Sequence, residues 1–92
     1  MSELKTIAEF QAYTGMNQCM LALYQSHGLF QTERNLRDER VLDSRWFTVW
    51  QEHFSYMTAG FDKLEALFQA TEAVFGADFL AKRRTERLLY GF

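Results

Sequence analysis

The sequence predicts an all-α protein, a small helical bundle of three or four helices with one long amphipathic helix over residues 44–75. Three observations support this fold class. The 92 residues contain no proline, the residue that interrupts helices most strongly. The aromatic content is 16 %, and many of the phenylalanines recur at helical spacing. No stretch alternates apolar and polar residues cleanly enough to indicate a set of strands.

Length and composition predict a single all-α domain spanning residues 1–92. A balance of 48 % hydrophobic and 24 % charged residues is typical of a globular chain rather than a disordered one. The single cysteine, Cys19, cannot form an internal disulfide, which favours a reducing compartment. No basic and apolar leader is visible, and the longest apolar run, residues 19–24, is far shorter than the ~20 residues of a membrane span. We therefore expect a cytoplasmic protein with no transmembrane segment.

The first helix is predicted to begin after Thr6, because Glu9 follows at the spacing of a capping box. Apolar residues then recur at helical intervals as far as Tyr24. Gly28 is suited to end the segment in a left-handed conformation. The pair Thr14-Gly15 is its weak point, at which the segment could divide into two short helices.

Residues 31–45 form the most polar stretch, and we interpret them as a solvated helix or a helix followed by a turn. Their apolar anchors are Leu36, Val41 and Leu42. Acids alternate with arginines throughout the stretch and are expected to pair with them rather than leave them free for phosphate. These charged residues are Glu33, Arg34, Arg37, Asp38, Glu39, Arg40, Asp43 and Arg45.

The clearest pattern in the chain is a heptad of phenylalanines after residue 45. Its members are Phe47, Phe54, Phe61, Phe68 and Phe75, with Trp50, Met57 and Leu64 three residues after the first three. Such a seam is typical of an amphipathic helix of the coiled-coil type. Residues 58–60 offer an alternative, a tight turn at Gly60, but the heptad phase passes through this glycine unchanged and favours one continuous helix.

A helix over residues 44–75 would be long for so small a protein. At about 1.5 Å per residue it spans roughly 48 Å, whereas a compact chain of this length has a diameter of roughly 30 Å. The prediction therefore requires an elongated bundle, a homodimer or a large partner to cover the overhang.

After Gly76, the chain is predicted to form a final helix over residues 79–90, with Asp78 as its cap and Gly91 as its stop. This helix is basic, with Lys82, Arg83, Arg84 and Arg87. Four cations make a nucleic-acid-binding protein an alternative function, although the net charge of −2 makes nucleic acid an unlikely partner.

Residues with catalytic or metal-binding chemistry are sparse. His27 and His53 lack a second ligand at metal-binding spacing, so we interpret His27 as a helix-end residue and His53 as a half-buried shoulder of the seam. Cys19 lies in an apolar run and is expected to be a small core residue. The sequence therefore predicts a protein that is not an enzyme and uses no metal or cofactor.

The predicted function is that of a non-enzymatic protein–protein interaction module, a small adaptor or a steric inhibitor and regulator. Aromatic side chains and arginines dominate the binding energy of protein interfaces. The predicted partner is a larger protein, a second copy of the chain, or both. Besides nucleic-acid binding, an amphipathic coat on a lipid or polymer granule is a further alternative. The predicted partner-binding residues are Trp46, Trp50, Phe54, Tyr56, Phe61, Arg83, Arg84 and Arg87.

Overall fold

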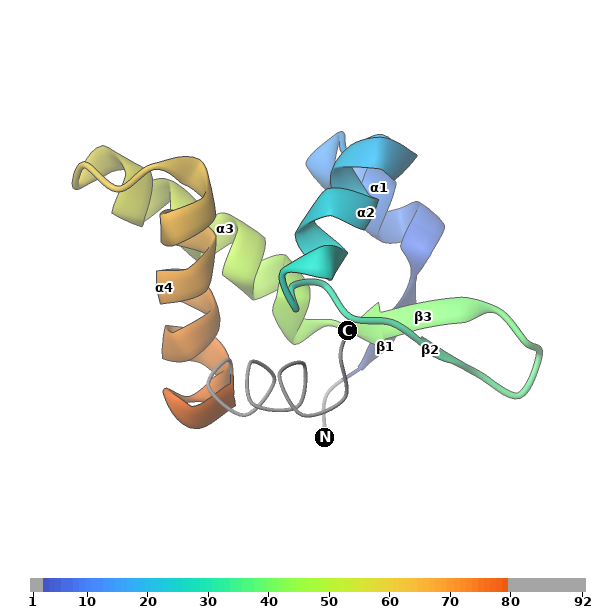
Figure 1. Cartoon of the computed structure of the whole chain (residues 1–92). Helices are drawn as coiled ribbons and strands as arrows, with labels where there is room; N and C mark the ends of the chain where they lie inside the picture. Colours follow the sequence, from blue (N-terminus) through green and yellow to red (C-terminus); the bar gives the residue numbers. More distant parts are fainter. Residues whose placement is uncertain (1–2, 80–92) are drawn as a thin grey trace. The chain divides into compact units, whose positions relative to one another are not determined.

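The computed structural model describes residues 3–79 and shows a mixed α/β fold (Figure 1). The chain divides into two compact units, Met1–Thr48 and Val49–Phe92. The described elements are β1 (Leu4–Thr6), α1 (Ile7–Thr14), α2 (Gln18–Ser26), β2 (Glu33–Arg34), β3 (Arg40–Asp43), α3 (Arg45–Thr58) and α4 (Lys63–Phe75). The prediction of an all-α helical bundle is therefore wrong, since the chain also forms a three-stranded sheet. The prediction of one domain stays a prediction.

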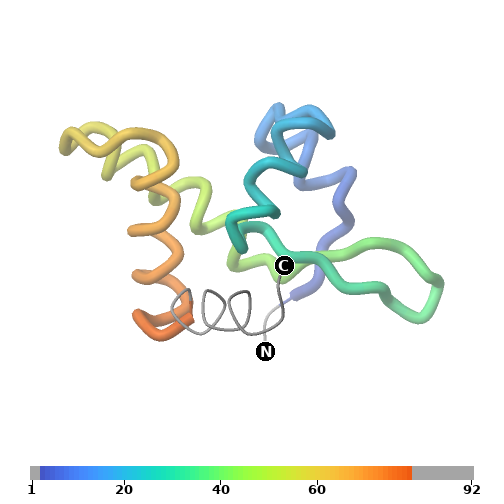
Figure 2. The backbone as a smooth tube through the Cα atoms, in the orientation of Figure 1, coloured from blue at the N-terminus to red at the C-terminus, as the bar shows by residue number. Residues whose placement is uncertain are grey.

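The sheet of the first unit has the strand order β1-β3-β2, and both pairs are antiparallel. Lys5 of β1 lies opposite Leu42 of β3, and Arg34 of β2 lies opposite Arg40. Helix α1 contacts β1 and β3. In Figure 2 the arm formed by residues 33–43 extends away from the tube of α1 and α2.

Within residues 31–45 the chain forms a β-hairpin over residues 33–43, so the prediction of a solvated helix, or of a helix followed by a turn, is wrong here. The side chain of Asn35 binds backbone amides within the turn, and short polar side chains that bind nearby backbone compete with helix formation. Asp38 has φ 62°, a left-handed conformation that asparagine and aspartate tolerate better than most residues. Beyond the turn, Val41 and Leu42 are both buried in the central strand.

The predicted capping box is confirmed at the start of α1. The amide of Glu9 donates to the Thr6 hydroxyl, and the Thr6 amide donates to the Glu9 carboxylate. The helix ends at Gly15, which has φ 75°, and Asn17 caps α2 by accepting from the amide of Met20. The first predicted helix is therefore two short helices, divided at its weak point.

Aromatic and aliphatic side chains form the core of the first unit. The ring of Phe10 lies 4.9 Å from that of Phe30 and 5.2 Å from that of Phe47. Phe30 also contacts Tyr24 and Trp46 edge to face. The other buried apolar residues of this unit are Met16, Leu21, Leu29, Val41 and Leu42.

Helix α3 begins at Arg45 in the first unit and continues into the second unit, where a turn separates it from α4 (Figure 1). Gly60 has φ 110°, which an L-residue with a side chain rarely adopts, and Asp62 caps α4 by accepting from the amide of Glu65. The prediction of a continuous helix over residues 44–75 is therefore wrong, and the coiled-coil-like heptad is divided between two helices and the turn that joins them. Without a helix of that length, the argument from helix length for an elongated bundle, a homodimer or a large partner no longer applies.

Candidate functional site

The two tryptophans predicted to bind a partner are buried. Trp46 is 2 % exposed, and its ring lies 5.3 Å from Phe30 in the core of the first unit. Trp50 is 9 % exposed, and its ring lies 5.6 Å from that of Phe54. Because a buried ring has little surface to offer a partner, both tryptophans serve as packing residues in this structure.

Two of the predicted aromatic residues are exposed, at the end of α3 and in the turn before α4. Phe54 is 50 % exposed, Met57 38 % and Phe61 41 %. Phe54 and Met57 are three residues apart on α3 and share one side of the helix. The ring of Phe61 lies 6.0 Å from that of half-buried Tyr56. For brevity, these three exposed residues at the end of α3 and in the turn after it, Phe54, Met57 and Phe61, are called the α3–α4 apolar surface.

Two polar side chains, His53 and Lys63, lie next to the ring of Phe54. His53 is fully buried, and its Nδ1 bonds the backbone carbonyl of Trp50. Since a carbonyl only accepts, Nδ1 carries the proton of the neutral ring. Nε2 therefore accepts from Nζ of Lys63, at 3.2 Å. The bond joins α3 to the first residue of α4.

The electrostatics of the pair follow from its burial. Burial lowers the pKa of His53, the Trp50 carbonyl opposes this shift, and the charge of Lys63 adds to it. Burial also lowers the pKa of Lys63. The ammonium of Lys63 lies 4.3 Å from the ring centroid of Trp50 and 5.8 Å from that of Phe54, distances at which aromatic rings attract cations. Lys63 is half-buried and thus contacts His53, Trp50 and Phe54 together.

The described part of the second unit carries mostly negative charge. Residues 49–79 carry five acids against one base, Lys63, a net charge of −4 with neutral histidine. Glu52, Asp62 and Glu65, which are close in sequence to the apolar surface, are all exposed. The arrangement therefore presents aromatic side chains in an acidic setting, which favours a ligand that is apolar and basic.

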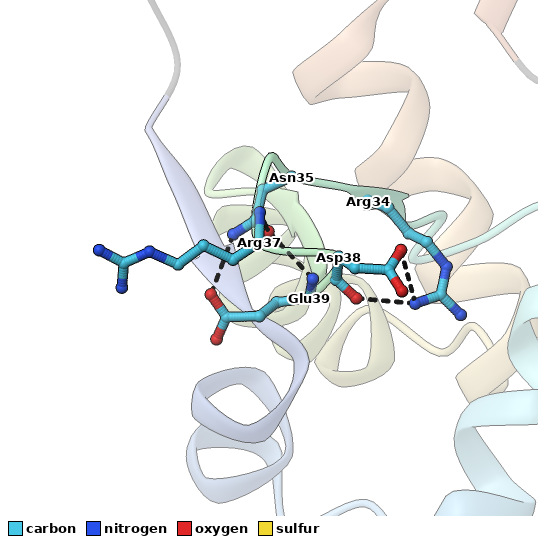
Figure 3. A network of polar contacts seen from close by, with 5 residues as sticks. All are labelled: Arg34, Asn35, Arg37, Asp38 and Glu39. Atoms are coloured by element: carbon cyan, nitrogen blue, oxygen red, sulfur yellow. Dashed lines mark hydrogen bonds and ion pairs between the residues drawn. The ribbon is translucent and has the colours of Figure 1, made fainter.

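The arginines of the polar stretch are largely engaged within the first unit. Arg34 Nη1 lies 3.4 Å from the Asp38 carboxylate and donates to the Asp38 carbonyl at 2.8 Å (Figure 3). Arg45 binds Asp43 through both Nε and Nη2, which raises the pKa of Arg45. Acid–base pairing, as the sequence predicts, is confirmed for these two arginines.

Other predicted residues fall in different places. Arg83, Arg84 and Arg87, with most of the predicted final helix, lie outside the described residues. Cys19 is exposed, so its prediction as a core residue is wrong, and His53 is fully rather than half buried. His27 is the C-cap of α2, which confirms its prediction as a helix-end residue.

The role of Lys63 is missed by sequence reasoning. The signal is present, because Asp62 and Glu65 stand at the spacing of an N-cap and its third helical residue. A turn before residue 63 allows Lys63 to contact His53, ten residues earlier, whereas a continuous helix would separate the two residues by about 15 Å.

Leu36, a predicted apolar anchor of the polar stretch, is the most exposed large apolar residue of those described.

Neither a metal-binding cluster nor a membrane span is found in the described part of the chain. Residues 3–79 contain no group of three or more histidine, cysteine, aspartate or glutamate side chains placed to hold a metal ion. No helix among them is both long and apolar enough to cross a membrane. Comparison with protein-family models, curated proteins and solved structures found no match for this chain.

Proposed function

We propose that this protein is a non-enzymatic protein–protein interaction module, a small adaptor or steric inhibitor that binds through the α3–α4 apolar surface. The observation that carries the proposal is the exposure of Phe54 and Met57 at the end of α3 and of Phe61 in the turn that follows it. Aromatic residues and methionine are enriched at the centres of interfaces. Aromatic residues are also among the side chains whose removal costs the most binding energy.

The support beneath the surface favours binding with little rearrangement. The ring of Phe54 lies 4.1 Å from that of His53, and His53 is in turn fixed by Trp50 and Lys63. Side chains that are already ordered lose less entropy when a partner binds. Phe54 is therefore the predicted anchor of the interface.

The acidic setting defines the chemistry of the partner. Exposed carboxylates at Glu52 and Glu65 attract a partner segment that combines apolar side chains with lysine or arginine. They also repel phosphates, so the described part of the second unit is poorly suited to nucleic acid. We propose a larger protein with an apolar and basic segment as the partner.

The test compares a double variant, Phe54→Ala/Phe61→Ala, with the wild type. A matched control is Leu23→Ala, because Leu23 is an exposed apolar residue of α2 in the other unit. Tagged proteins are used to capture partners from lysate, and each captured protein is then purified for direct measurement of its Kd. We expect the double variant to weaken binding about tenfold or more, and Leu23→Ala to leave it unchanged.

Circular dichroism and thermal melts establish that both variants are folded. Sedimentation velocity over a range of concentrations shows whether the partner is a second copy of the chain. A dimer that the double variant dissociates would identify self-association as the use of this surface. An unchanged Kd for the double variant, with the fold intact, would exclude the proposal.

A further inference from the structure

The tip of the β2–β3 hairpin, residues 35–39, is held by a network centred on Asn35 (Figure 3). The Asn35 side-chain oxygen accepts from the amides of Arg37 and Glu39, at 2.9 and 3.0 Å. Its side-chain nitrogen donates to the Glu39 carboxylate. Backbone bonds join Asn35 to Asp38 and Glu39, and the Arg34–Asp38 ion pair adds a further link. The polar groups of the tip are thus used to fix its shape.

The base of the hairpin is also fixed. Nη2 of Arg40 donates to the side-chain oxygens of Gln25 and Thr32, both at 3.4 Å. Gln25 in turn donates to the carbonyl of Phe30, a core residue. The hairpin is therefore tied to the end of α2, and the tube in Figure 2 shows the arm extending outward from this base.

Two side chains of the tip take no part in this network. Leu36 has a relative exposure of 106 %, so that its whole side chain faces water. The guanidinium of Arg37 points away from the other four labelled residues in Figure 3 and forms no ion pair within the described residues. A rigid turn thus presents one apolar side chain and one uncommitted cation next to each other.

We infer that the hairpin tip is a second binding site, at which Leu36 enters an apolar pocket on a partner protein and Arg37 pairs with a carboxylate at the rim of that pocket. A fixed turn reduces the entropy lost on binding, which is the advantage of the Asn35 network for such a site. Arg34 is already neutralised by Asp38, so the cation available to the partner is Arg37. That free cation is the reason for placing one carboxylate at the rim of the pocket.

The charges of the tip favour a protein over other partners. Glu33, Asp38 and Glu39 outnumber the two arginines of residues 33–39 and would repel the phosphates of nucleic acid or of an anionic lipid surface. One leucine among charged residues also buries too little apolar area for a membrane anchor. A single carboxylate placed against Arg37 meets much less of this repulsion than a row of phosphates does.

The site lies in the first unit and is independent of the α3–α4 apolar surface. To test it, benzoylphenylalanine replaces Leu36 in the full chain, and photocrosslinking in lysate is compared with the same replacement of Ala22, an exposed residue of α2. The protein crosslinked at position 36 is purified, and its Kd is measured for the unlabelled wild type, Leu36→Ala, Leu36→Met and Asn35→Ala.

We expect a protein adduct at position 36 that is absent at position 22. Leu36→Ala should weaken binding about tenfold, whereas Leu36→Met, which keeps the apolar volume, should stay within about threefold of the wild type. Asn35→Ala retains Leu36 and Arg37 but loosens the turn, so it should also weaken binding. Phe54→Ala/Phe61→Ala should leave the adduct at position 36 unchanged, which separates this site from the proposed function.

Three outcomes would overturn the inference. The first is equal crosslinking at positions 36 and 22. The second is an unchanged Kd for a folded Leu36→Ala. The third is an adduct with nucleic acid or lipid in place of protein, which would show that the exposed leucine inserts into a different class of partner.

Discussion

The helices α2 and α3 end in the same way, although the sequence around them differs. Residues 24–29 read Tyr-Gln-Ser-His-Gly-Leu, and residues 56–61 read Tyr-Met-Thr-Ala-Gly-Phe. In both, the glycine has a positive φ and its amide donates to the carbonyl three residues earlier. The next amide, of Leu29 or Phe61, donates to the tyrosine carbonyl at 3.1 Å. Both ends are Schellman motifs, in which glycine supplies the left-handed residue.

What differs is the environment of the two ends. Tyr24, Gly28 and Leu29 are buried, so the first motif is part of the core. Tyr56 is half-buried and Phe61 is exposed, so the second motif lies at the surface and contributes to the proposed interface. The local sequence therefore specifies where a helix stops, whereas the surrounding structure decides whether the apolar residue after the glycine stabilises the fold or is available to a partner.

The largest expected effect contrasts Leu29→Ala with Phe61→Ala. Truncating a fully buried leucine costs about 2–5 kcal/mol, which is a large part of the stability of a domain of this size. Phe61 already faces water over much of its surface, so its truncation should cost about 1 kcal/mol or less. Urea denaturation followed by circular dichroism measures both values. Equal losses of stability would show that the two ends are equally part of the core.

The next effect comes from Gly60→Ala. A continuous helix and a turn at Gly60 predict changes in protein stability of opposite sign for this variant. In a continuous helix this change would stabilise the protein by about 1 kcal/mol. At φ 110° it should instead destabilise it by about 1–2 kcal/mol, even though no atom lies within 4 Å of the added Cβ. The same denaturation measurement decides, and a gain in stability with increased helicity would favour the continuous helix.

The contrast between the glycines also shows what the sequence could predict. The Thr6–Glu9 capping box and the stop at Gly28 were predictable because each depends on a few adjacent residues. Gly60 is also a glycine that can end a helix, but the seven-residue spacing of the phenylalanines favours a continuous helix there. The phenylalanines remain seven residues apart in sequence across the turn at Gly60, although the helix does not continue through it.

The sheet could not have been predicted by periodicity. β1 has three residues and β2 has two, too few to show an alternation of apolar and polar side chains. Their pairing depends on β3, which lies far from β1 in sequence. Of the predicted binding residues in the described part, Phe54 and Phe61 are exposed and the two tryptophans are buried. Helical spacing identifies an apolar face but does not tell which part of it the rest of the chain covers.

A smaller effect is expected at the caps that begin α2 and α4. Asp62 accepts from the Glu65 amide at 2.8 Å, and Asn17 accepts from the Met20 amide at 2.8 Å. Replacing either residue by alanine should cost about 1 kcal/mol. Asp62→Asn should cost only a few tenths, because it keeps the acceptor and loses only the charge at the helix N-terminus. A loss for Asp62→Asn as large as that for Asp62→Ala would instead assign the effect to the charge.

The smallest expected effect is a pH dependence from the end of α3, where burial lowers the pKa of His53 below its ordinary value of 6.5. The unfolded chain takes up a proton on His53 near pH 6.5, whereas the folded protein resists it. The stability from the neutral ring is therefore complete above pH 6.5 and decreases as the pH falls below it. Denaturation between pH 8.0 and 5.5 should show this decrease in the wild type. This decrease should persist in His27→Gln and flatten in His53→Gln.

Lys63→Met should retain most of the decrease, because burial lowers the pKa of His53 more than the charge of Lys63 does. A flat profile for Lys63→Met would instead identify repulsion between the two cations as the main cause, and would make the bond between α3 and α4 the pH-sensitive part of the apolar surface.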